Sequence, residues 1–186
     1  MKYYRLIGVL GAVLAYPFIA FSIILTPWFN FYDNALSDLG NIAWNAPIAH
    51  LYNTGLVLSG LLVAFFSLLT FLKHHSWRYL SWSLLLMLTG IDLALIGIFP
   101  EDTGRIHGLV SVMFFTMMIL VMFLHGFCSL IVKNYTTGIL SFTLSIASAI
   151  VWMVKWGWKG VAIQETLTSL MATAWLLKVS LQPATR

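Results

Sequence analysis

Apolar residues form six long runs along the chain, and short polar segments separate them. A helix needs about 20 apolar residues to cross the hydrocarbon core of a bilayer, and each run is close to that length. The runs are continuously apolar rather than alternating between apolar and polar residues, which argues against a membrane β-barrel. The pattern predicts six transmembrane helices, which cover residues 6–27, 49–72, 79–99, 107–132, 138–154 and 160–179.

The segments between the runs predict how the helices are connected. Four of the five connections are short enough to be hairpins, so consecutive helices should be antiparallel neighbours. The first connection, residues 28–48, is longer, and its Leu36 and Leu39 would be out of place in a free polar loop. The two leucines favour a re-entrant or interfacial segment, and a short capped helix without a functional role is the alternative. We therefore expect residues 1–186 to form one all-α integral membrane domain, an antiparallel bundle of six helices.

Composition excludes most other classes of protein. The 186 residues are 60% hydrophobic and only 9% charged, whereas an average soluble domain carries about 25% charged residues. The single cysteine, Cys128, excludes a disulfide-stapled scaffold. The net charge of +4 comes without a basic run, so the sequence predicts no nucleic-acid partner and points to membrane lipids instead.

Lysine and arginine residues predict the orientation of the bundle. With the N-terminus inside, seven of the ten basic residues would lie on the cytoplasmic side and three on the outer side. The inner set is Lys2, Arg5, Lys73, Arg78, Lys133, Lys178 and Arg186, and the outer set is Arg105, Lys155 and Lys159. Both termini are therefore expected in the cytoplasm.

All six acidic residues fall in the outer half of this topology. They are Asp33, Asp38, Asp92, Glu101, Asp102 and Glu165. Asp92 lies about 12 Å and Glu165 about 7 Å inside its predicted helix, at about 1.5 Å per residue. Charged side chains at such depth normally face the bundle interior or a water-filled cavity, so both are candidate functional residues, with packing as the alternative.

Two histidines join this outer layer, because His50 opens the second predicted helix and His107 opens the fourth. Small or polar residues follow His50 at helical spacing, and His107 shares one helix face with Ser111, Phe114, Met118 and Met122, so both side chains are expected to face the interior. We predict one polar pocket near the outer ends of the helices. Its expected rim is Asn34, Asn53, Glu101, Asp102 and Gln164.

Carboxylates and imidazoles are the groups that acid–base or metal-assisted hydrolysis requires. The catalytic candidates are Ser37, Asp38, Asp92, His107 and Glu165. A divalent metal held by His50, His107 and Asp92 would leave a coordination position for water, although their spacing matches no strong zinc motif. These residues favour a hydrolase or transferase that acts on lipids.

Three other functions stay open from the sequence. Acids in the outer half could form a relay in a small transporter or a proton- or cation-coupled channel, with a homodimer as its working unit. His107 and His125 lie 18 residues apart on one helix face, and each could belong to a bis-histidine pair in a b-type haem protein. A non-catalytic scaffold, whose outer acids recruit a partner, is the fourth reading.

Three short motifs carry a family resemblance. They are Ser37-Asp38-Leu39-Gly40, Phe99-Pro100-Glu101-Asp102 and Ile106-His107-Gly108. The chain resembles, over nearly its whole length, a prokaryotic family of small polytopic proteins called domain of unknown function 998. It is more distantly similar to the Frag/DRAM/Sfk six-helix group, some of whose members are linked to lipid remodelling. The resemblance implies a prokaryotic plasma-membrane protein with an important first outer loop, and it names no reaction.

Overall fold

The computed structural model describes residues 2–182, which form an all-helical fold without strands. The long helices are α1 (Lys2–Val13), α2 (Ala15–Ile24), α4 (Ile48–Lys73), α5 (Trp77–Ile98), α6 (Arg105–Ile131), α7 (Tyr135–Met153) and α8 (Ala162–Leu181). The short elements are α3 (Ile42–Asn45) and the 3-10 helices η1 (Leu36–Gly40) and η2 (Glu101–Thr103). The predicted helical class is confirmed, and the first predicted helix is divided between α1 and α2. Arg186, a predicted inner anchor, lies outside the described residues.

Five stretches within the described residues are long and apolar enough to cross a membrane, by length and composition. They are Tyr3–Ile24, Ile48–Lys73, Trp77–Ile98, Arg105–Ile131 and Tyr135–Met153. The sixth predicted span is also a helix, α8, but it carries both Glu165 and Lys178 among several hydroxyl residues. A sixth crossing therefore stays a prediction.

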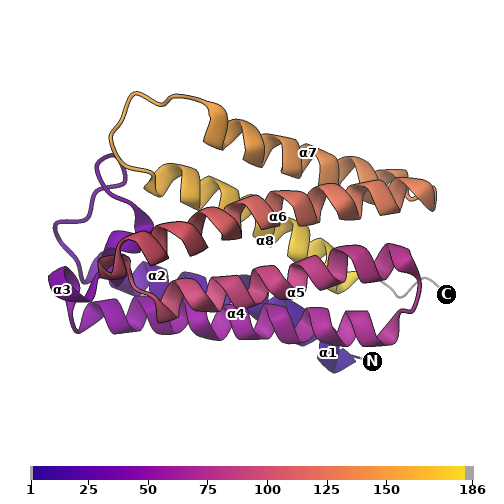
Figure 1. Ribbon diagram of the computed structural model, residues 1–186, viewed down its shortest axis with the longest axis horizontal. Coiled ribbons are helices and arrows are strands. Elements are labelled where there is room, and N and C mark those ends of the chain that lie inside the picture. Colours follow the sequence, from indigo (N-terminus) through magenta and orange to yellow (C-terminus); the bar gives the residue numbers. More distant parts are fainter. Residues whose placement is uncertain (1, 183–186) are drawn as a thin grey trace.

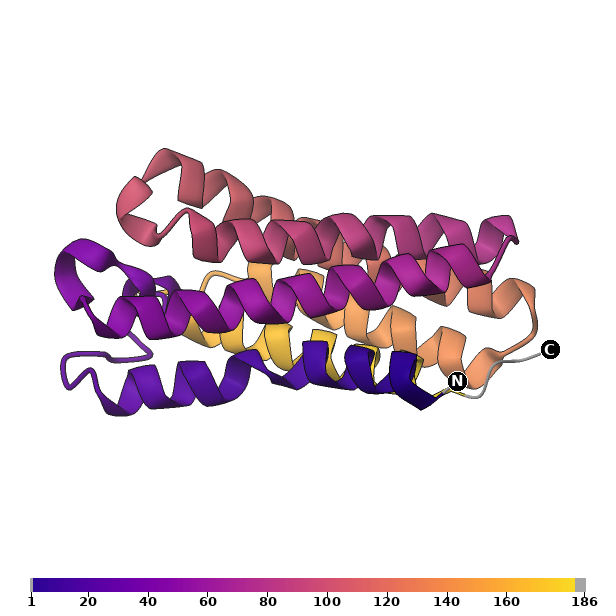
Figure 2. The same ribbon diagram turned by 90° about the horizontal axis from the view of Figure 1, so that it is seen from below.

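The helices lie side by side along the long axis of the molecule (Figures 1 and 2). The start of α1, the end of α8 and the α4–α5 and α6–α7 turns lie at one end, which we call the terminal end. The first connection with α3, the α5–α6 turn and the α7–α8 connection lie at the opposite end, which we call the loop end. The lysine and arginine count predicts that the terminal end is cytoplasmic.

Helices α4 and α5 approach each other closely at small residues. A Cβ atom on Gly60 would lie 2.5 Å from the backbone nitrogen of Ala94 and 2.6 Å from the carbonyl oxygen of Gly90. A Cβ atom on Gly90 would in turn lie 2.5 Å from the backbone nitrogen of Ala64. The small-residue stripe of the second predicted helix is thus used within the chain, where it lets two backbones pack against each other.

The core consists of two clusters of buried side chains, one toward each end. Phe66, Trp82 and Trp175 belong to the cluster at the terminal end. Leu39 and Tyr52 belong to the cluster at the loop end, and Leu39 is completely buried there. The first connection therefore supplies core residues to the bundle.

Candidate functional site

Residues 34–45 of the first connection fold back onto the loop end of the bundle, and for this contact with the bundle alone we call them the re-entrant segment. Its 3-10 helix η1 contacts α2, α4 and α8. Leu36 and Ser37 are buried together with Leu39. The part of the segment around these residues is therefore shielded from water, and each buried polar group there needs a partner within the protein.

Two carboxylates hold the first half of the re-entrant segment. The backbone N–H of Leu36 donates a 2.6 Å hydrogen bond to Glu165 Oε2, which reaches it from α8. Asp38 Oδ2 accepts from the backbone N–H of Ala35 at 3.1 Å and from the side-chain amide of Asn34 at 2.8 Å. Glu165 and Asp38 therefore act as acceptors for this segment.

Two further carboxylates, on η2, hold its second half. Asn41 Nδ2 donates to Glu101 Oε2 at 2.5 Å, and the backbone N–H of Ile42 donates to Asp102 Oδ1 at 3.1 Å. Four of the six acidic residues are thus engaged in holding one segment.

Buried amides bind the carbonyl groups of the same segment. Asn53 on α4 donates to the Gly40 carbonyl oxygen at 2.9 Å. Asn45 donates to the Leu39 carbonyl oxygen at 2.9 Å. The predicted rim residue Gln164 is buried nearby on α8 and accepts from Trp158 Nε1 at 3.1 Å.

His107 is buried at the loop end, and both of its ring nitrogens have partners. Nδ1 lies 2.8 Å from the carbonyl oxygen of Phe99, and Nε2 lies 3.1 Å from Ser111 Oγ. Because a carbonyl can only accept, Nδ1 carries a proton, and in the neutral ring Nε2 accepts from the Ser111 hydroxyl. His107 therefore links α6 to the end of α5.

The predicted metal site of His50, His107 and Asp92 is not assembled. No group of three or more His, Cys, Asp or Glu side chains within residues 2–182 could hold a metal ion. His50, which the sequence predicts to face the interior, is exposed, because it lies on the outward face of α4 together with Thr54 and Leu58. Asp92 is buried on α5, and its Oδ2 has no hydrogen-bond partner within the described chain.

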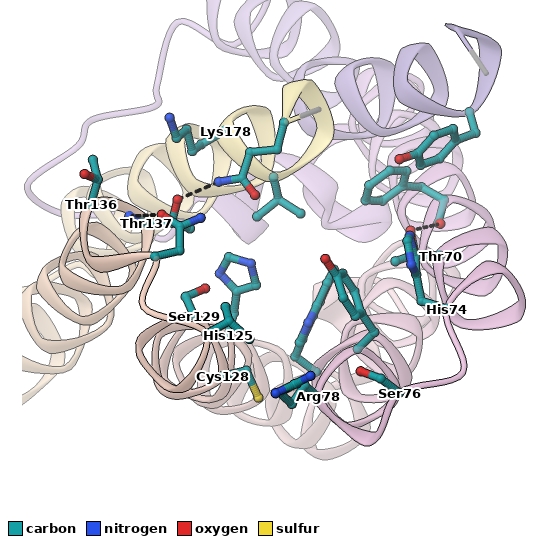
Figure 3. Close-up of a pocket in the computed structure, with 18 residues that line it drawn as sticks. Thr70, His74, Ser76, Arg78, His125, Cys128, Ser129, Thr136, Thr137 and Lys178 are labelled. Atoms are coloured by element: carbon teal, nitrogen blue, oxygen red, sulfur yellow. Dashed lines mark hydrogen bonds between the residues drawn. The ribbon is translucent and has the colours of Figure 1, made fainter. Parts of the chain in front are cut away.

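A partly open cavity of about 830 Å³ lies instead at the terminal end, lined by residues of α1, α4, α5, α6, α7 and α8 (Figure 3). Arg78 and Lys178 contribute two positively charged side chains to its lining, and none of the six acidic residues contributes. Burial lowers the pKa of His74, which also lines the cavity, and the positive charges of Lys73 and His75 lower that pKa further. The positive charge of the cavity lining therefore comes from Arg78 and Lys178.

Much of the remaining cavity lining is aromatic or carries hydroxyl groups. Tyr4 and Phe66 stack with their ring centroids 5.8 Å apart and form part of one wall. Ser129 and Thr136 add hydroxyl groups on the side of α6 and α7. The cavity thus combines cationic, hydrogen-bonding and apolar surfaces, the combination that an amphiphilic anion requires.

His125 projects into this cavity from α6 (Figure 3). Its Nδ1 lies 3.2 Å from Trp175 Nε1 and 3.0 Å from Ser141 Oγ. The ring is also packed edge to face against Trp82, with centroids 5.0 Å apart. Three helices besides α6 therefore fix this imidazole.

The comparison with protein families matches residues 9–182 of the chain to the family described as "Protein of unknown function (DUF998)". The chain belongs to the DUF998 family. No curated protein and no solved structure matches it. The family assignment agrees with the resemblance seen in the sequence motifs, and it assigns no reaction to the two ends of the bundle.

The motifs behind that resemblance have a structural role in this DUF998 protein. Asp38 holds the re-entrant segment, Glu101 and Asp102 bind it from η2, and His107 closes the α5–α6 turn. The sequence patterns that single out these residues therefore mark the architecture of the loop end.

Sequence reasoning missed the terminal-end cavity of this DUF998 protein. The sequence indicates Arg78 and Lys178 only as anchors that set orientation, and His125 only as a haem candidate. The available signal was that the basic residues predicted at this end have no acidic residue near them in the sequence.

Proposed function

We propose that this membrane-type helical protein binds an anionic amphiphile, a lipid or lipid-linked phosphate, in the terminal-end cavity. The observation that carries the proposal is an 830 Å³ cavity with Arg78 and Lys178 in its lining and no acidic residue. Ligand pockets typically have volumes of about 300–1,000 Å³. Basic pockets between transmembrane helices on the cytoplasmic side are suited to anionic head groups.

The predicted orientation supports the same ligand. The lysine and arginine count predicts that the terminal end is cytoplasmic, where the adjoining leaflet carries anionic lipids. The head group would lie between Arg78 and Lys178, and the acyl part would lie against the aromatic wall around Phe66. This assignment keeps the lipid-directed function expected from the sequence and moves it to the other end of the bundle.

A hydrolase or transferase at the loop end has less support. Glu165, Asp38, Glu101 and Asp102 are engaged in hydrogen bonds to the re-entrant segment. Acid–base chemistry needs a carboxyl or imidazole group that can reach a substrate, and these acids are occupied with holding the fold. We therefore propose binding at the terminal end in place of catalysis at the loop end.

The test compares lipid binding by the purified protein and by an Arg78→Gln/Lys178→Gln double variant. Native mass spectrometry with phosphatidylglycerol and with phosphatidylcholine would give the affinities. We expect the wild type to prefer the anionic lipid, and the double variant to bind it at least about tenfold more weakly, because charge-assisted hydrogen bonds are lost.

The control is the Arg105→Gln/Lys155→Gln double variant, which removes two exposed charges of the same types at the loop end. It should bind phosphatidylglycerol like the wild type, since neither residue lines the cavity. Equal weakening in both double variants would mean that only net charge matters, and the proposal would then be wrong.

A further inference from the structure

The hydrogen bonds of His125 determine which of its ring nitrogens carries the proton. The indole N–H of Trp175 can only donate a hydrogen bond, and it lies 3.2 Å from His125 Nδ1. Nδ1 must therefore be the acceptor. An imidazole that accepts at Nδ1 is neutral and carries its single proton on Nε2.

The Ser141 hydroxyl is compatible with this assignment. Its Oγ lies 3.0 Å from His125 Nδ1 and 2.9 Å from the carbonyl oxygen of Thr137. A hydroxyl has a single proton, so in this assignment Ser141 donates to Nδ1 and not to the Thr137 carbonyl. A doubly protonated ring would, in contrast, set two donors against each other at the Trp175 contact.

The protonated nitrogen is free to bind a ligand. His125 Nε2 has no hydrogen-bond partner within residues 2–182. It is also not one of the unpaired polar atoms in this part of the chain that are completely inaccessible to solvent. The residue lines the cavity, and Figure 3 shows its ring on the cavity side of α6. An N–H donor is thus available to a molecule that occupies the cavity.

Two tryptophans fix the direction of this donor. Trp82 and Trp175 pack against the imidazole at interplanar angles of 82° and 84°, with centroids 5.0 and 5.3 Å away. The ring is therefore held from two sides in addition to its Nδ1 hydrogen bonds. A donor that is held in place before binding loses little conformational freedom when a ligand arrives.

We propose that His125 is the uncharged hydrogen-bond donor for a phosphate oxygen of the ligand, and that Trp175 is its positioning residue. This inference rests on the proposed function and specifies the chemistry of the head group. Three residues that line the cavity are able to donate to such a ligand: Arg78 on α5, His125 on α6 and Lys178 on α8, whose side chain is exposed. A phosphate group presents oxygens in several directions and can accept from three sides, whereas a planar carboxylate has only two oxygens.

The test measures binding of three probes to the full-length protein in detergent: inorganic phosphate, glycerol phosphate and phosphatidic acid in mixed micelles. We expect His125→Leu to weaken binding about tenfold or more, because a hydrogen bond to a charged oxygen is lost. His125→Gln can both accept from Trp175 and donate to the ligand, so it should restore most of the affinity. Trp175→Phe keeps the histidine but removes the N–H that donates to its Nδ1, so this variant should also weaken binding.

The exposed His50 supplies the matched control, and His50→Leu should leave binding unchanged. A spectroscopic measurement guards against variants that fail to fold. In wild-type protein labelled with ¹⁵N-histidine, the His125 signals should show the Nε2–H form before ligand is added. The Nε2 signal should then shift on addition of the phosphate probe, which a purely structural histidine would not do.

The source of the phosphate follows from which probes bind. Binding of phosphatidic acid alone, or of all three probes, supports the proposal if His125→Leu weakens it, and the pattern distinguishes a lipid from a free phosphate. The proposal for His125 is overturned if binding depends on Arg78 and Lys178 while His125→Leu binds like the wild type and the Nε2 signal does not shift on addition of the phosphate probe. The proposed function would then still stand. If no probe binds, both are wrong.

Discussion

The Glu165→Ala variant is expected to lose about 1–3 kcal/mol of unfolding free energy, because the buried N–H of Leu36 would be left without an acceptor. The hydrogen bond joins α8 to the re-entrant segment across 129 residues of sequence. Hydrogen exchange should accelerate at the Leu36 amide and its neighbours in η1. Thermal unfolding in detergent and exchange measured by mass spectrometry would check both effects.

The Glu165→Gln variant keeps an acceptor oxygen and should lose clearly less stability than Glu165→Ala. Asp33→Ala is the matched control, since Asp33 is exposed and accepts only a surface hydrogen bond from Asn30. If Glu165→Ala and Asp33→Ala unfold at the same temperature, then Glu165 does not hold the re-entrant segment.

The Gly60→Ala variant is expected to be strongly destabilised, by about 1–3 kcal/mol or more, because the added methyl group overpacks a helix contact. Its Cβ would meet backbone atoms of Ala94 and Gly90 on α5 at 2.5 and 2.6 Å, and backbone cannot move aside as a flexible side chain can. The two helices would have to separate along their contact. Thermal unfolding in detergent would record the loss as a lower midpoint temperature.

Gly108→Ala makes the same chemical change within a helix at an open position, with nothing within 4 Å of the added carbon. Alanine forms helices better than glycine by about 1 kcal/mol, so this variant should be as stable as the wild type or slightly more so. A Gly60→Ala protein that is as stable as Gly108→Ala would contradict the close packing of α4 against α5.

The sequence predicts the helices well because helix length depends on a local property, the number of consecutive apolar residues that can cross the hydrocarbon core. It also predicts that Leu36 and Leu39 return to the bundle, because an exposed loop gains nothing from them. Sequence gives no register between distant helices, however. It therefore cannot show that Glu165 meets the backbone of Leu36 rather than a substrate.

The errors at the two ends of the bundle have different physical causes. Helical spacing groups His50 with the buried Asn53, but the His50 side chain lies on the exposed face that Thr54 and Leu58 continue, and spacing alone does not distinguish the two faces. The terminal-end cavity depends on how six helices fill space together, which no local pattern reports. Arg78 and Lys178 suit two roles equally, as orientation anchors and as ligand-binding cations, and only the structure places both at one cavity.

The most direct test of ligand binding in the terminal-end cavity is photolabelling with a phosphatidic acid that carries a diazirine in its acyl chain. Reconstituted wild-type protein would be irradiated, and the labelled residues would be identified by mass spectrometry. We predict labels on cavity-lining residues such as Phe66 and Val179, and their loss in the Arg78→Gln/Lys178→Gln variant. Labels confined to residues on the exposed surface of the bundle, such as Ile146, and equal in both proteins would contradict ligand binding in the terminal-end cavity.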